Sequence, residues 1–148
     1  MLITILQSLF ERDLLKLKYE IEQYRDETKL WYIEKGISNS AGNLCLHLTG
    51  NLNAFIGAEL GKTGYVRNRE QEFSLKNVPR KELIKQIESV IQIIKTTLQN
   101  VTEQQLASDY PMMVFKEKIS TGLFLTHLAT HLNYHLGQIN YHRRLVDI

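Results

Sequence analysis

Three histidines follow one another at four-residue steps: His127, His131 and His135, in the segment THLATHLNYHLGQINYHRR. Gln138 and His142 continue the same stripe. At about 100° per residue of an α-helix, all five side chains fall within an arc of about 80°. Imidazoles that point the same way can share one metal ion, and imidazole suits zinc, nickel, copper and iron. The spacing therefore indicates a metal site on one face of a helix.

The one histidine outside this stretch is His47, in a segment predicted to be helical. Asn43, His47 and Asn51 lie within about 80° of one another on that helix. Their amide side chains, next to a histidine, leave room for water or substrate. Cys45 points about 160° away from His47, so we do not expect it to act as a ligand or a nucleophile.

Apolar residues recur at three- and four-residue steps in four long segments. They predict helices from the N-terminus to about residue 26, from about 41 to 61, from Pro79 to about 100, and from about 120 to 145. Ser40 is the predicted N-cap of the second helix, and a helical turn is expected near Trp31. The only apolar stretches that could form strands, 73–75 and 112–115, are too short for a sheet.

These elements predict an all-α fold in a single domain, residues 1–148. We expect a four-helix bundle with one long connection, of about 18 residues, between the second and third helices. Of the 148 residues, 43% are hydrophobic, which is enough for a core. The single cysteine suits a reducing compartment, and no segment resembles a membrane span or an export signal. The sequence thus predicts a soluble cytoplasmic protein.

The net charge of +2 gives no general case for nucleic-acid binding. Residues 62–81 are nevertheless locally basic, with six lysines and arginines against two glutamates. Arg67 and Arg69 make this loop a candidate site for an anionic small molecule. The alternative is a solvated loop, because charged side chains usually stay exposed.

Apolar residues border the histidine stripe on both sides, which predicts that it faces the bundle interior. Several buried imidazoles are hard to satisfy by hydrogen bonds alone, and a metal ion solves that problem. His47 offers the matching ligand from a second helix, as in other bundle-core metal sites. His127 either replaces one of the later histidines as ligand or lies one turn away, whereas His142 is expected at the end of the bundle.

One histidine in the second helix and HxxxHxGQ in the last resemble the DinB/YfiT superfamily of metal-binding four-helix bundles. The matching stretches are GNLCLHLTGNL (42–52) and HLNYHLGQINYHRRL (131–145). The resemblance covers essentially the whole chain, and the loop TGYVRNREQEFS resembles an uncharacterised subfamily. It implies that His47, His131 and His135 are the metal ligands, with His127 outside that set.

The resemblance further implies nickel or zinc as the metal and a homodimer as the assembly. Several members of the superfamily are S-transferases that use bacillithiol, mycothiol or glutathione, and others are described as metal-dependent hydrolases. The sequence contains no distinctive thiol-binding motif, so a transferase activity follows from the resemblance alone.

Three functions remain open at this stage. In the first, the metal lowers the pKa of a small thiol that attacks an electrophile, with Gln138 orienting a ligand and Asn43 and Asn51 holding the substrate. In the second, activated water hydrolyses an amide or ester, although no acidic residue neighbours the HxxxH pair as a base. In the third, the bundle binds metal or a partner without catalysis.

Overall fold

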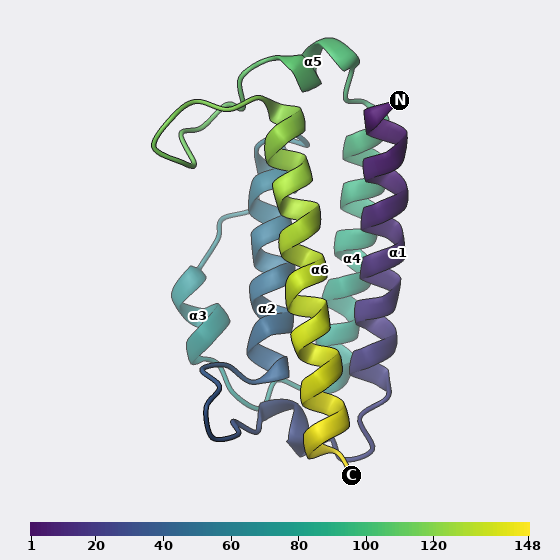
Figure 1. Ribbon diagram of the computed structural model, residues 1–148, viewed down its shortest axis with the longest axis vertical. Helices are drawn as coiled ribbons and strands as arrows, with labels where there is room; N and C mark the ends of the chain where they lie inside the picture. Colours follow the sequence, from purple (N-terminus) through teal and green to yellow (C-terminus); the bar gives the residue numbers. More distant parts are fainter.

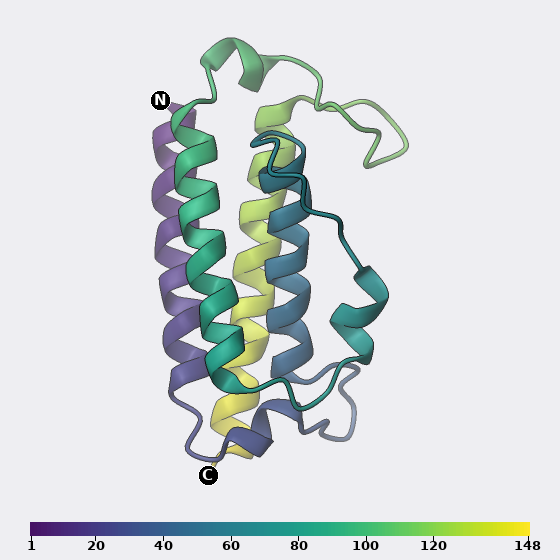
Figure 2. The ribbon, with the colours of Figure 1, turned by 180° about the vertical axis from the view of Figure 1, so that it is seen from behind.

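The computed structural model describes residues 1–148, and its regular elements are all helices. Four long helices run side by side along the long axis (Figures 1 and 2): α1 (Leu2–Glu22), α2 (Ala41–Leu52), α4 (Arg80–Gln99) and α6 (Thr121–Val146). The shorter elements are the 3₁₀-helix η1 (Glu27–Trp31), the π-helix η2 (Asn53–Ala58), α3 (Arg69–Ser74) and α5 (Glu103–Ala107). No strand forms, and only Asp109 and Ser120 make an isolated bridge. The predicted all-α class is confirmed.

Each of the long helices packs against two others. Helix α1 contacts α4 and α6, and α2 contacts the same pair. The 29 buried apolar residues between them form one cluster, with Phe10, Leu48, Ile87 and Leu132 all fully buried. Burial of this cluster supplies the main favourable free energy of folding, because apolar surface leaves water.

Helix α2 is the most enclosed element of the molecule, with all 12 of its residues buried. The long helices α4 and α6 cover two sides, and α3 packs on the outer side (Figure 1). Asn43 fastens the end of α3 to α2, since its Nδ2 donates to the backbone oxygens of Glu72 and Leu75, both at 2.9 Å. Side chains on α2 that face α3 are therefore held in a polar but water-poor environment.

The helix boundaries differ from the predicted ones in three places. Helix α1 ends at Glu22, before the predicted residue 26, because the carboxylate of Asp147 accepts the backbone N–H groups of Arg25 and Asp26 and holds them in the turn. The second helix, predicted to run to about residue 61, is α-helical only to Leu52 and continues as the π-helix η2 to Ala58; an i→i−5 bond of 2.9 Å joins Gly61 N to Ile56 O. The long connection contains the helix α3, which periodicity did not reveal because it spans only 6 residues.

Other local predictions agree with the structure. The hydroxyl of Ser40 accepts the backbone N–H of Asn43 at 3.2 Å and so caps α2. The helical turn expected near Trp31 is η1. None of the helices combines the length and the apolar character that crossing a membrane requires.

His142 lies near the C-terminal end of α6, as expected, and is buried. Its Nδ1 lies 2.6 Å from the hydroxyl of Tyr24, and its Nε2 lies 2.8 Å from the backbone oxygen of Tyr32. Both ring nitrogens are therefore engaged in joining α6 to the end of α1 and to the segment after η1.

Candidate metal centre

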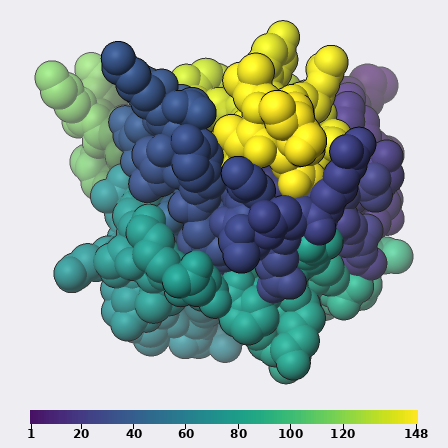
Figure 3. Space-filling view, turned by 90° about the horizontal axis from the view of Figure 1, so that it is seen from below, coloured from purple at the N-terminus to yellow at the C-terminus, as the bar shows by residue number.

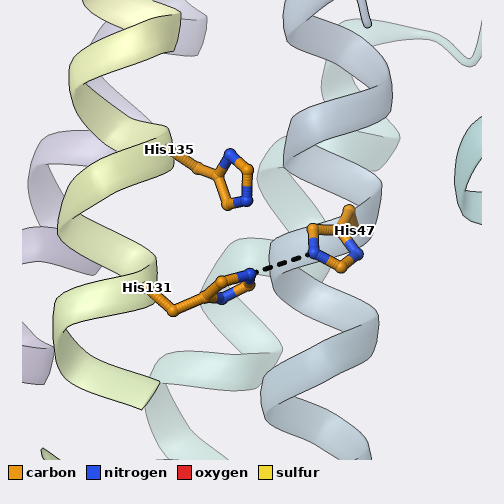
Figure 4. A group of neighbouring side chains, drawn as sticks. All are labelled: His47, His131 and His135. Carbon is orange, nitrogen blue, oxygen red and sulfur yellow. Dashed lines mark hydrogen bonds between the residues drawn. The ribbon is translucent and has the colours of Figure 1, made fainter. Parts of the chain in front are cut away.

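Three imidazoles from two helices converge between α2 and α6. His47 comes from α2, whereas His131 and His135 come from successive turns of α6, and their rings point into the space between the helices (Figure 4). One potential ligand atom from each residue lies within 4.8 Å of the others. The structure thus brings together the three histidines that the family resemblance implied as ligands.

The closest approach is between Nε2 of His47 and Nε2 of His131, at 3.2 Å. Two nitrogens bound to one tetrahedral zinc ion, each at about 2.0–2.1 Å, would lie about 3.3 Å apart. The spacing of this pair suits two ligands of a single ion. All pairs of ligand atoms lie within 4.8 Å, so the wider pairs must close somewhat to share one ion.

His47 is oriented by a buried carboxylate on its far side. Its Nδ1 lies 3.0 Å from Oε1 of Glu72, which is only 5% exposed. An ionised carboxylate only accepts hydrogen bonds, so Nδ1 carries the proton and donates it. In the neutral ring, the Nε2 lone pair then faces His131. A carboxylate behind a ligating histidine fixes the tautomer and the ring orientation in this way.

Arg67 keeps Glu72 ionised. Its Nε donates to Oε2 and its Nη2 to Oε1, both at 2.8 Å, which is a bidentate ion pair. Burial by itself would raise the pKa of the Glu72 carboxyl, but the hydrogen bonds from His47 and Arg67 outweigh it and hold the pKa below its usual value. Arg67, predicted as an anion-binding residue, has its charge committed to this carboxylate.

A glycine lets Glu72 approach α2 so closely. A Cβ added to Gly50 would overlap Oε2 of Glu72 and lie 2.8 Å from its Cδ. Any larger residue at this position would displace the carboxylate from His47. Gly50 follows His47 by one turn, so the same helix face presents the imidazole and accommodates its partner.

His135 is oriented from its own helix. Its Nδ1 lies 2.7 Å from Oε1 of Gln138, one turn further along α6. With the amide oxygen as acceptor, Nδ1 carries the proton and Nε2 is left with its lone pair. Gln138 therefore contacts a candidate ligand, in the position that the sequence analysis gave it.

His131 lies between the other two imidazoles. Burial, followed by the proximity of His135 and His47, lowers the pKa of His131 to about 4. Burial is also the largest influence on His135, whose pKa is lowered although the bond to Gln138 opposes the shift. Nδ1 of His131 is buried and has no hydrogen-bond partner. Neutral imidazoles are the protonation state that a metal ion requires.

The remaining candidates are arranged as follows. His127 is exposed, and the centroid of its ring lies 6.2 Å from that of His131 and 5.1 Å from that of Phe115. Asn51 is 7% exposed, and its Oδ1 has no hydrogen-bond partner. The side-chain amide of Asn43 is engaged in hydrogen bonds to the backbone at the end of α3. The guanidinium of Arg69 lies 5.2 Å from the centroid of the Phe73 ring. Cys45 is completely buried.

Glu72 was not among the functional residues predicted from the sequence. In the sequence this glutamate is only a counter-charge within the basic loop, because 25 residues separate it from His47 and no periodicity links them. One signal was available: Gly50 interrupts a helix interior, where a glycine often marks the close approach of another segment.

Fold and site together define an all-helical protein with a three-histidine candidate metal centre. The chain belongs to the family described as Protein of unknown function (DUF1572), whose model matches residues 4–147. No protein with a curated description matches the chain.

The lowered pKa of His131 predicts how the metal-free protein responds to acid. The folded protein keeps this imidazole neutral down to about pH 4, whereas an unfolded histidine takes up a proton below about pH 6.5. Unfolding therefore binds a proton in this window, and the free energy of unfolding should fall as the pH falls from about 6.5 towards 4. Urea denaturation of the metal-free protein at successive pH values measures this slope.

The matched variant is His131→Asn, which removes the titrating group. Its slope between about pH 6.5 and pH 5 should be shallower than that of the wild type, because most carboxyls titrate below this range. Equal slopes for the two proteins would contradict the assignment.

Proposed function

We propose that this protein binds one divalent metal ion through His47, His131 and His135. The observation that carries the proposal is the convergence of three imidazoles from two helices, two of which are oriented by hydrogen bonds from Nδ1. Such outer partners are a regular feature of metal-ligating histidines. The low pKa of His131 also supports the proposal, because it keeps this imidazole in the neutral form that a metal ion requires.

We further propose that the four long helices form a four-helix bundle of the DinB/YfiT kind. Two observations support this assignment. Helices α1 and α2 each pack against α4 and α6, and the three candidate ligands lie on α2 and α6. Zinc and nickel are the proposed ions, because both accept three neutral imidazoles.

The proposed activity is the activation of a small thiol for transfer to an electrophile. Three protein ligands leave a coordination position open, as in catalytic sites. A divalent cation bound there would lower the pKa of a thiol that reaches it. The residues of the chain hold the three imidazoles in place, and Gln138 fixes the orientation of His135.

The alternative, hydrolysis by activated water, needs a free base beside the open position. The nearest acidic side chain to His47 is that of Glu72, which contacts Nδ1, the nitrogen directed away from His131, and is also paired with Arg67. A carboxylate engaged in this way orients the imidazole and is not free to take a proton from water. The contacts of Glu72 therefore favour the thiol reading.

Metal analysis tests the ligand set. The purified wild type should bind about one divalent ion per chain, and His131→Ala should lose affinity by about 100-fold or more, because losing a ligand costs more than losing an outer partner. Isothermal titration with Zn²⁺ and Ni²⁺ measures the affinity. The control is His142→Gln, a histidine of the same helix whose ring nitrogens are engaged elsewhere. Equal losses in the two variants would refute the assignment.

A second prediction concerns the support of His47. Gly50→Ala should lower the affinity for Zn²⁺ by about 10–100-fold, the range found for outer partners of ligating histidines, because the new methyl group displaces Glu72. Glu72→Gln should act in the same direction. Gly137→Ala is the matched control, since a Cβ there meets no atom within 4 Å. Unchanged affinity in Gly50→Ala would show that Glu72 does not support the site.

Thiol binding is tested with the Co²⁺-loaded protein, whose visible spectrum reports its ligands. Addition of bacillithiol or glutathione should shift the spectrum and add a thiolate-to-cobalt band, and the shift should saturate. An alcohol analogue of the same thiol serves as control and should leave the spectrum unchanged. If no cellular thiol alters the spectrum, the thiol reading fails while the metal site stands.

A further inference from the structure

A groove of about 560 Å³ lies beside the candidate metal centre. Its walls are the segment 34–39, which precedes α2, and the C-terminal half of α6; we call it the α6 groove. Figure 3 views the end of the molecule where these two segments lie next to each other. His135 and Gln138 belong to its wall, so the groove reaches the candidate metal centre.

Six of the 14 residues that line the α6 groove have large apolar or aromatic side chains. These are Ile37, Leu44, Tyr134, Tyr141, Leu145 and Val146. Tyr134 is 65% exposed, and Tyr141 and Leu145 are each 67% exposed. Apolar side chains gathered so openly around one concavity indicate a binding surface.

The groove offers a ligand little fixed charge. Glu34 and Lys35 are adjacent residues of opposite sign, and the Glu34 carboxylate already accepts the backbone N–H of Lys35 at 2.7 Å. His142 is committed through both ring nitrogens to Tyr24 and Tyr32. The opposite charges of Glu34 and Lys35 leave the groove with no net fixed charge, which favours an uncharged ligand over a charged one.

We propose that the α6 groove binds the uncharged, apolar body of a small molecule with a flat aromatic or alkyl framework. This molecule is the second substrate, the electrophile that the thiol attacks, and its reacting end lies toward His135. Its role as substrate and this placement rest on the proposed function, whereas its binding in the groove does not. The polar contacts around Glu72 lie on the other side of His47 and leave this side to the apolar substrate.

The dimensions of the groove favour a small molecule over a second protein chain. Ligand pockets span about 300–1,000 Å³ and combine apolar and aromatic side chains with polar groups. The α6 groove, at about 560 Å³, falls within this range and combines both kinds of side chain. The continuity with His135 and Gln138 further favours a substrate.

The test uses Nile red, an uncharged flat aromatic dye whose fluorescence rises in apolar surroundings. Metal-free wild-type protein should bind it saturably, and Leu145→Asp should weaken binding at least about tenfold, because a carboxylate in the apolar wall must lose water. The matched control is Leu15→Asp on α1, also an exposed leucine of a long helix at 52% exposure, which should change the affinity less than about twofold.

A second measurement locates the dye. In the Co²⁺-loaded protein, the proton resonances of bound dye should broaden relative to those in the Zn²⁺-loaded protein, because the paramagnetic ion lies nearby. Binding that is not saturable, or equal in Leu145→Asp and Leu15→Asp, would overturn the proposal. Sedimentation showing that Leu145→Asp converts a wild-type dimer into a monomer would make the groove an interface between copies and overturn it as well.

The two proposals can fail separately. Loss of dye binding in Leu145→Asp with full Zn²⁺ affinity supports the groove independently of the metal ligands. Dye binding that is unaffected by Leu145→Asp, in a protein that binds Zn²⁺ through the three histidines, overturns the groove alone.

Discussion

The carboxylate of Glu72 is buried against α2, and a buried carboxylate is stable only when its oxygens have partners. Arg67 supplies two hydrogen bonds and His47 a third. This requirement explains why α3 packs on α2 and why a glycine stands at position 50. It also fixes the His47 ring, and with it the nitrogen that faces α6.

Buried ion pairs of this kind are weak contributors to stability, because desolvation offsets much of the attraction between the charges. Three imidazoles packed together are also weak contributors to stability, and the pKa values of two of them are lowered. A protein that needed only a stable core would fill this space with apolar side chains. The cluster makes physical sense if it holds a ligand, and a cation is the ligand that unprotonated imidazoles attract.

The surroundings of the candidate centre are strongly asymmetric. On the side of α3, Glu72 and Arg67 fill the space next to His47, so this side orients and encloses the His47 ring. On the side of the segment 34–39, His135 and Gln138 border an open, largely apolar groove. One side of the centre is thus built to hold the imidazoles still, and the other side gives access to them.

The sequence by itself determined the features that depend on local periodicity. Four-residue spacing placed His131 and His135 on one helix face, the apolar pattern indicated the four long helices, and Ser40 marked the start of α2. Tertiary structure decided what joins distant segments. The pairing of Glu72 with His47, the commitment of Arg67 and Asn43 to that region, and the α6 groove depend on how connections fold back onto helices. Such contacts leave no repeating pattern in the chain, because they depend on packing between elements far apart in sequence.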